Sequence, residues 1–200
     1  MVQSRIVGRK RNVSIEVAAW DGAMADVDLS CACMFTHEVA GSAPQGGLAH
    51  LDTLLDGRLV QLRHEGLFRA EEGETMFIDR PPAAIAARSV LIVGLGDPEP
   101  WTPEVMRGAV GKAFAAAVLW RAASVAFAPS LLDSGLEPTR TGDVAEHMAE
   151  ALTVALDRDS RLRSLGLREA GALTRWIFDV GEGRFESKSE RFRAALSTGG

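Results

Sequence analysis

The chain is 200 residues long, which suits one domain large enough to bury a core without disulfides or metals. Its composition, 46% hydrophobic and 24% charged residues, is that of a globular protein, and no run approaches the roughly 20 apolar residues of a membrane span. The formal charge of −5 and the isoelectric point near 5.4 argue against a nucleic-acid partner bound through a broad basic surface.

Two strands are predicted in the first forty residues. Residues 12–20 alternate apolar with polar side chains and are rich in β-branched types, a pattern typical of a strand with one solvated face. The basic run 9–11 beside it is interpreted as a solvated face or as charges that guard a sheet edge. Residues 28–36 predict a second strand, whose apolar face carries Leu29, Cys31, Cys33 and Phe35.

A glycine-rich break at 41–47 is followed by leucines at helical spacing. Their three- and four-residue intervals predict one amphipathic helix over 48–62. Gly57 weakens this helix by about 1 kcal/mol relative to alanine. Gly66 stands where the helix C-cap is expected. The leucines that define the stripe are Leu48, Leu51, Leu55, Leu59 and Leu62.

A buried strand and a capped helix are predicted in the middle of the chain. A short strand is expected over 75–78. The continuous apolar run 89–96 ends in glycines and predicts a strand covered on both faces. Thr102 is the expected N-cap of the next helix, with Pro103 in its first turn and Glu104 near its positive end.

The same order of strand and helix repeats towards the C-terminus. Residues 124–129 predict a strand, and Thr141 is expected to cap the helix that follows. A late strand is predicted over 176–180 and a closing charged helix over 186–196. Strands that alternate with helices predict the α/β class, with a largely parallel sheet and helices on both faces.

The cysteines indicate a reduced protein. Cys31 and Cys33 are one residue apart, so in a strand they point to the same face and are expected to be buried in the core of a cytoplasmic protein. A vicinal redox pair is the alternative. Neither the cysteines nor the histidines show a metal-binding spacing, so we expect no metal and no cofactor. We expect one domain over 1–196 and a flexible tail or linker over 197–200.

An ordered set of motifs resembles a known family. The set comprises the helix start Gly46-Gly47, the strand Val-Leu-Ile-Val-Gly-Leu-Gly at 90–96, the helix opening Thr-Pro-Glu-Val-Met-Arg at 102–107, and the strand at 124–127. In this order, over just more than half the chain, the motifs resemble the N-terminal domain of the M17 leucine aminopeptidases. The resemblance implies a macro-domain-like fold, a three-layer α/β/α sandwich with a mixed, mostly parallel central sheet.

The chemistry of that family is absent from this sequence. Its two-metal site needs a lysine, several carboxylates and the motif Asn-Thr-Asp-Ala-Glu-Gly-Arg, because two metals together activate a water. The only asparagine is Asn12, in a different context. The chain also continues to the strand at 176–180 and a last helix, as many macro domains do. A non-catalytic domain that closes on itself is therefore expected.

Ligands of such a sheet bind outside the carboxyl ends of the strands. The candidate loops are 41–47, 94–99 and 130–142, where glycine amides and helix N-termini can hold phosphate oxygens. Asp97 and Glu99 in the second loop argue against a pyrophosphate there. The candidate ligand-binding residues are Gly46, Gly47, Gly94, Gly96, Ser130, Ser134, Gly135 and Thr141.

Two functions follow as expectations. The first, implied by the resemblance, is a non-catalytic assembly, regulatory or interaction module with a protein partner or a second copy of itself. The alternative is a sensor domain that binds ADP-ribose or a related nucleotide in the macro-domain manner. Enzymatic hydrolysis of ADP-ribose is a third reading, for which no residue of this sequence can be assigned the role of activating water.

Overall fold

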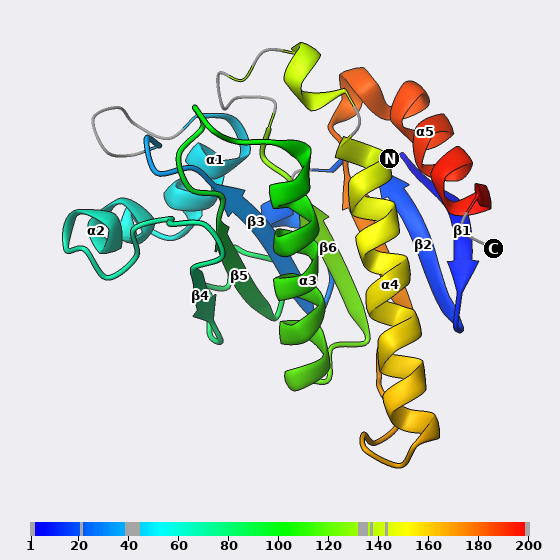
Figure 1. Cartoon of the computed structure of the whole chain (residues 1–200). Helices are drawn as coiled ribbons and strands as arrows, with labels where there is room; N and C mark the ends of the chain where they lie inside the picture. The colour runs from blue at the N-terminus through cyan, green and yellow to red at the C-terminus, as the bar shows by residue number, and fades with distance from the viewer. Residues whose placement is uncertain are drawn as a thin grey trace.

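The computed structural model describes residues 3–20, 22–38, 45–131, 136, 138–142 and 144–198. Its strands form one sheet, with helices on both sides (Figure 1). The strands are β1 (Ser4–Lys10), β2 (Val13–Ala18), β3 (Leu29–Met34), β4 (Thr75–Ile78), β5 (Ser89–Gly94), β6 (Ser124–Ala128) and β7 (Arg175–Asp179). The helices are α1 (Gly46–Leu54), α2 (Arg58–His64), α3 (Pro103–Leu119), α4 (Val144–Ser164) and α5 (Phe185–Thr198), with 3-10 turns η1 (Gly22–Met24), η2 (Pro138–Thr141) and η3 (Glu182–Arg184).

The sheet runs in the order β1-β2-β7-β6-β3-β5-β4. Its inner strands β2, β7, β6, β3 and β5 are parallel, whereas β1 and β4 pair antiparallel at the two edges. The carboxyl ends of the parallel strands therefore share one edge of the sheet, which lies towards the top of Figure 1. This confirms the predicted mixed, mostly parallel sheet.

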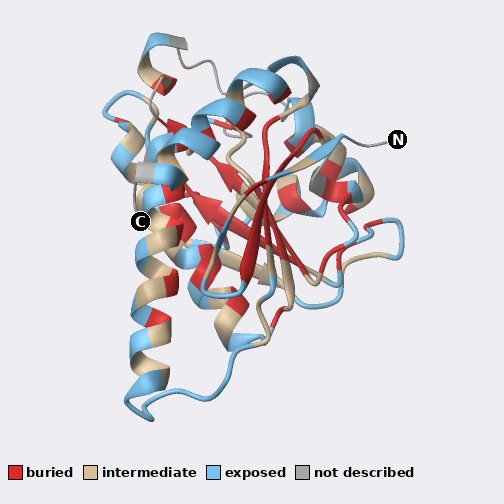
Figure 2. Ribbon diagram, turned by 90° about the vertical axis from the view of Figure 1, so that its right-hand side faces the viewer, coloured by how far each residue is buried: buried red, intermediate tan, exposed pale blue. Residues whose placement is uncertain are grey.

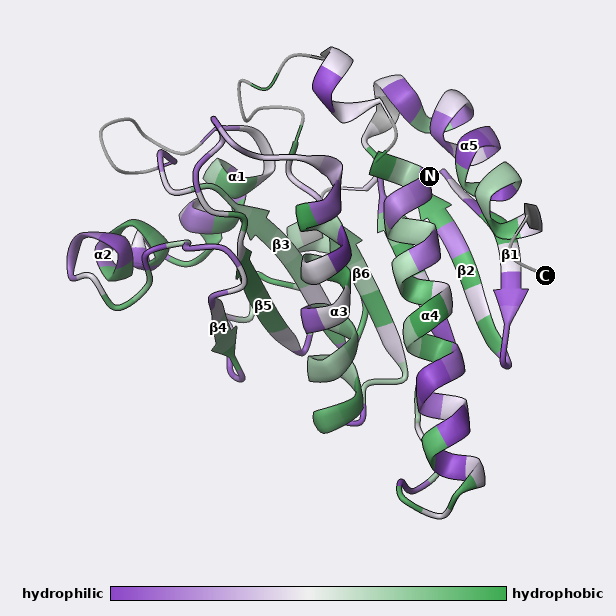
Figure 3. Cartoon of the chain, viewed as in Figure 1, coloured by the Kyte–Doolittle hydropathy of each residue, from purple (hydrophilic) through white to green (hydrophobic). Residues whose placement is uncertain are grey.

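Each face of the sheet has its own hydrophobic layer. On one face α3, α4 and α5 cover an aromatic cluster that includes the fully buried Phe127 and Trp176. On the other face α1 and α2 place Leu51 and Leu59 against the sheet beside Ile177. The buried residues accordingly follow the strands and the inner sides of the helices (Figure 2), and the inner strands are mostly hydrophobic (Figure 3). The predicted three-layer α/β/α sandwich is confirmed.

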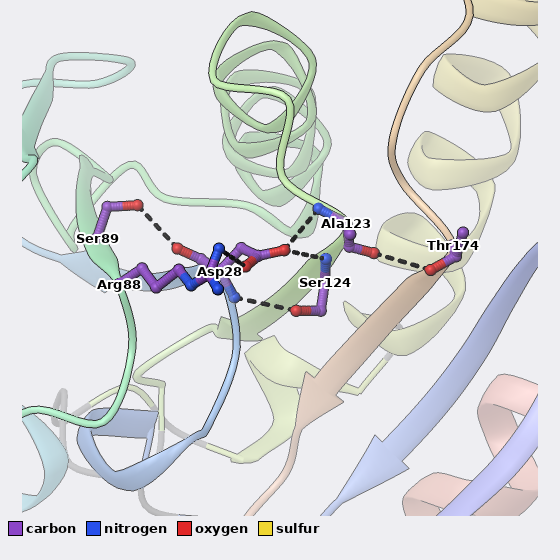
Figure 4. Close-up of polar contacts among 6 residues, drawn as sticks. All are labelled: Asp28, Arg88, Ser89, Ala123, Ser124 and Thr174. Carbon is purple, nitrogen blue, oxygen red and sulfur yellow. Dashed lines mark hydrogen bonds and ion pairs between the residues drawn. The ribbon is translucent and has the colours of Figure 1, made fainter.

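A polar cluster around Asp28 fixes the amino ends of the parallel strands (Figure 4). The Asp28 carboxylate accepts hydrogen bonds from the main-chain N–H groups of Ala123 at 2.7 Å and Ser124 at 3.2 Å, where β6 begins. The Ser89 hydroxyl donates to the Asp28 carbonyl, and the Thr174 N–H donates to the Ala123 carbonyl. These bonds join the starts of β3, β5, β6 and β7, so they set the register of neighbouring strands and satisfy buried main-chain groups.

The single helix predicted over 48–62 is wrong, because the structure has two helices, α1 and α2, at this place. Gly57 has a φ of 74°, in the left-handed region, so the helical path stops there. The Asp52 carboxylate then accepts a hydrogen bond from the Val60 N–H at 3.1 Å and supports the start of α2. The predicted leucines still form one apolar surface, because leucines of both helices pack against the same face of the sheet.

Other predicted boundaries shift by a few residues. Thr141 ends the turn η2, and α4 begins three positions later, at Val144. The closing helix α5 continues through Thr198, into the segment expected to be a tail. No helix among the described residues combines the length and the apolar character that crossing a bilayer requires.

The N-terminal edge strand β1 was not predicted, because its sequence lacks a clear apolar alternation. The basic run 9–11 lies at this edge of the sheet, as expected if its charges guard a sheet edge. Lys10 and Arg11 both pair with Asp157 of α4, at 3.6 and 2.7 Å.

Candidate ligand-binding site

A cavity of about 310 Å³ opens at the carboxyl edge of the sheet. Its floor is formed by the middle of β3 and the ends of β6 and β7, represented by Ala32, Ala128 and Asp179. The first turns of α1 and α4 and one side of α5 form its walls, so both helical layers contribute. Its volume is at the lower end of the range of about 300–1,000 Å³ typical of small-molecule pockets. This is the edge at which ligands of open parallel sheets bind.

Some of the residues predicted from the sequence meet in this cavity. Gly47 at the start of α1, Ser130 after β6 and Thr141 at the end of η2 all line it. Gly46 precedes the lining residue Gly47 but is not itself part of the wall. Ligand contact by these residues stays a prediction. Ser134 and Gly135, together with positions 41–44 of the first candidate loop, lie outside the described residues.

Gly94 and Gly96 do not line the cavity. Their lack of a side chain has a packing reason, because a Cβ on Gly94 would lie 2.1 Å from the carbonyl oxygen of Glu71. Gly96 has a φ of 75°, accepts the Thr36 N–H through its carbonyl and donates its own N–H to the Ala70 carbonyl. The close approach of the turn before β4, rather than a ligand, accounts for the glycines that end β5.

Two buried carboxylates line the cavity and were missed from the sequence. Asp179, 8% exposed, ends β7 and accepts hydrogen bonds from the N–H groups of Trp20 at 3.1 Å and Gly181 at 3.2 Å. Glu38, 7% exposed, accepts the Phe35 N–H at 2.7 Å. Main-chain donors therefore hold both carboxylates in place. An acidic residue at the end of a buried apolar strand was the sequence signal for Asp179.

Positive charge also lines the cavity. Arg184 of η3 and Lys188 of α5 both line the cavity. Arg184 is exposed, and its side chain makes no ion pair within the part of the chain that the structure describes. Asp97 and Glu99, which argued against an anionic ligand, are not part of the wall. The cavity thus combines an apolar interior with both carboxylates and cationic side chains.

The wall residue Trp20 is supported by a neighbouring ion pair. Arg175 donates to both oxygens of Glu16, at 2.9 and 2.8 Å, and its guanidinium lies 5.6 Å from the centre of the Trp20 ring. The Ser4 hydroxyl donates to the same carboxylate at 3.0 Å. The hydrogen bonds from Arg175 lower the pKa of Glu16, against the opposing effect of burial, so the carboxylate stays ionised. The pair therefore fixes Trp20 at the cavity mouth.

The two cysteines are buried in β3, and Cys31 is also among the residues that line the cavity. Cys31 and Cys33 are both fully buried on the same face of β3, as predicted, and burial raises the pKa of each thiol. Within the described residues there is no group of three or more histidine, cysteine or acidic side chains that could hold a metal ion.

The fold and the cavity together define a class of protein: a three-layer α/β/α domain with a ligand-sized cavity at the carboxyl ends of its parallel strands. Residues 35–165 match the family model described as "Cytosol aminopeptidase family, N-terminal domain". The chain therefore belongs to the cytosol aminopeptidase family, as its N-terminal domain.

A curated relative agrees with this assignment. The chain is 31% identical over 155 residues to a protein of Acidobacterium capsulatum described as "Probable cytosol aminopeptidase". The match covers 66% of this chain but only 30% of the relative. The chain thus spans less than a third of the length of that protein.

Solved structures show the same fold. A mutant of the tomato leucine aminopeptidase aligns with a TM-score of 0.66 at 22% identity, over 89% of this chain and 35% of that one. An Oceanobacillus iheyensis macrodomain with ADP aligns with a TM-score of 0.64 at 11% identity, over 99% of this chain and 97% of that one. The expected macro-domain-like fold is confirmed, and the sheet order places β7 inside the sheet, between β2 and β6.

Proposed function

We propose that this chain is a non-catalytic module through which proteins of the cytosol aminopeptidase family are assembled or regulated. The observation that carries the proposal is the place of its C-terminal segment. β7 inserts between β2 and β6 as a parallel strand, and α5 packs over β1 and β2. Residues after the family match therefore complete the same sheet.

The part of the family that the chain matches supports this proposal. The matched part of the family is its N-terminal domain, and the chain spans 30% of the aminopeptidase relative. The two-metal motif expected of the family's peptidases does not occur in the sequence. These facts support a role beside a catalytic protein rather than in place of one.

The proposal is tested with the purified chain and a full-length aminopeptidase of the same family. We expect no hydrolysis of leucine p-nitroanilide by the chain in Mn²⁺ or Zn²⁺. We also expect it to change the mass or the kcat of the full-length enzyme, measured by light scattering after gel filtration and by the same assay. The Oceanobacillus iheyensis macrodomain, which shares the fold, is the control. Chelator-sensitive hydrolysis by the chain alone would overturn the non-catalytic role, and an unchanged enzyme would overturn the assembly role.

A second candidate function is binding of ADP-ribose or a related nucleotide. The cavity favours it, because an apolar interior suits a base while Arg184 and Lys188 suit an anionic group. The cavity also lies at the edge of the sheet where a nucleotide is expected. A protein of similar fold has been solved with ADP.

Calorimetry with ADP-ribose and ADP tests this candidate, with two glycine variants as a matched pair. A Cβ added at Gly47 or at Gly108 meets no atom of the described residues within 4 Å, so both positions have room for a larger side chain to begin. Gly47 lines the cavity, whereas Gly108 lies on α3 away from it. We expect Gly47→Leu to weaken binding by at least about tenfold and Gly108→Leu to leave it unchanged. Absence of binding heat for both nucleotides, or equal weakening by both variants, would refute nucleotide binding.

A further inference from the structure

A groove of about 860 Å³ runs between α3 and α4, on the outer side of these helices. Small residues create it: Gly111 and Ala115 of α3 face Ala151 and Ala155 of α4. Residues four apart lie on the same side of a helix, so each pair removes side-chain volume along the seam. The segment 168–171 after α4 closes one end of the groove. This surface is separate from the cavity described above, because the two share no lining residue.

Exposed apolar side chains gather along the groove. Leu119, 77% exposed, and Val154, 57% exposed, form part of its lining from α3 and α4. Leu165 and Leu167 are also exposed and directly precede the closing segment. Figure 3 shows the C-terminal end of α3 as hydrophobic where it reaches the surface. A concentration of exposed aliphatic side chains beside a groove is typical of an interaction surface.

Arginines outnumber carboxylates in the lining of the groove, although the chain as a whole is acidic. Four arginines line it against two carboxylates, a local excess of two positive charges on a chain of net charge −5. Arg163 and Arg168 both pair with Asp159, which is almost fully buried. Arg158 is exposed and makes no ion pair with any residue in the described parts of the chain. Arg121 pairs with the lining Glu169, and Arg107 pairs with Glu104 and Glu150, which lie outside the lining, so Arg158 is the lining arginine whose charge is open to a partner.

We infer that this groove binds an acidic amphipathic helix of a protein partner. A helix laid along the seam between two helices packs its ridges into their groove. Its apolar face would cover Leu119 and Val154, and a carboxylate on its flank would pair with Arg158. α4 is 21 residues long, or about 30 Å, so the seam accommodates a helix of comparable length. The apolar lining favours a helix over nucleic acid, whose phosphates would meet aliphatic side chains.

This inference rests on the proposed interaction module and gives the chemistry of its partner. Selection of peptides provides the test. A phage-displayed library of peptides of about 18 residues, long enough for a helix of about 27 Å, is selected on the immobilised chain. The Val154→Glu variant is added in solution as a competitor. It removes phage that bind elsewhere on the chain, so the phage that stay on the immobilised protein are those whose binding depends on the groove. We expect the surviving peptides to carry net negative charge and apolar residues at i, i+3 or i+4, and i+7.

Synthetic forms of these peptides are then titrated by fluorescence anisotropy. Val154→Glu places a carboxylate in the groove, and Gly111→Leu fills it, since a Cβ there meets no atom within 4 Å. Each is expected to weaken binding by at least about tenfold. Leu67→Glu is the matched control, because Leu67 is 68% exposed and lies beyond α2, away from the groove. Thermal unfolding by circular dichroism verifies that all three variants are folded.

Several outcomes would overturn the inference. These are the absence of groove-dependent clones, the selection of basic peptides, and binding that Gly111→Leu leaves unchanged. Displacement of the peptides by single-stranded DNA would instead identify a nucleic-acid surface. A dimer of the chain that Val154→Glu dissociates would identify a second copy as the occupant. If Val154→Glu still changes the mass or kcat of the full-length aminopeptidase as the unaltered chain does, the interaction module stands and the groove is not its site.

Discussion

Gly94→Ala is the substitution for which the structure makes the sharpest prediction. Gly94 is the last residue of β5 and packs against the turn before β4. A Cβ built on it lies 2.1 Å from the carbonyl oxygen of Glu71 and 2.6 Å from the carbonyl carbon of Ala70, both main-chain atoms. Contacts of a Cβ below 3.0 Å essentially never occur. The strand or the turn must therefore move by about 1 Å.

That movement also strains two hydrogen bonds. The Gly94 N–H donates to the Glu74 carbonyl at 2.8 Å, and the Gly94 carbonyl accepts the Gly73 N–H at 3.0 Å. Overpacking costs about 1–3 kcal/mol and each strained hydrogen bond about 1 kcal/mol, so we expect a loss of about 3 kcal/mol. For a domain of this size, that corresponds to a melting temperature lower by about 10 °C.

Urea unfolding at neutral pH measures this effect, and Gly108→Ala is the matched control. Gly108 lies within α3, where an added Cβ meets no atom within 4 Å. The same chemical change there should raise the free energy of unfolding by about 1 kcal/mol, because alanine favours the helix. The two variants are thus expected to shift stability in opposite directions. A Gly94→Ala protein within about 0.5 kcal/mol of the unaltered chain would refute the packing argument.

Three further predictions concern buried polar groups and thiols. Asp28→Ala removes the acceptor of two main-chain N–H groups at the start of β6. It should lower the free energy of unfolding, measured in urea, by about 2–3 kcal/mol. An effect below about 0.5 kcal/mol would contradict the role of Asp28 in setting the strand register. Arg175→Met should cost about 2 kcal/mol at pH 7, less than for a fully buried pair because the Arg175 side chain is 36% exposed. The folded pKa of Glu16 lies below its ordinary value of 4.5, so the pair stabilises the fold above that pH, and this stabilisation disappears as the pH falls through the folded pKa. The difference in free energy of unfolding between the Arg175→Met variant and the unaltered chain should therefore shrink in urea titrations below about pH 4. A difference that stays constant with pH would show that charge is not its cause. Cys31 and Cys33 should not react with Ellman's reagent in the native protein and should both react in guanidinium, because burial raises their pKa; rapid native labelling would contradict the buried strand β3.

Local patterns determined most of the elements. The run before Gly94 predicts a strand buried on both faces, and β5 lies between β3 and β4 with helices on both sides. Thr102 and Pro103 mark the start of α3 correctly, although the Thr102 side chain makes no capping hydrogen bond. Alternating strands and helices then define the layered architecture. These features follow from short-range sterics and hydrophobic periodicity, which neighbouring residues encode.

Only the tertiary structure decided what meets across the sheet. The Trp20 N–H binds a carboxylate 159 positions away on Asp179, because β7 inserts beside β2, and no local pattern specifies that pairing. The same holds for the groove. Gly111 and Ala155 are small residues on two different helices, and the sequence does not show that these helices lie against each other. At the break near Gly57, the Asp52 carboxylate accepts a hydrogen bond from the Val60 N–H across the turn and so supports a second helix start, which the leucine spacing does not indicate. Periodicity fixes which side of an element is apolar, whereas strand order and helix contacts depend on the packing of the whole chain.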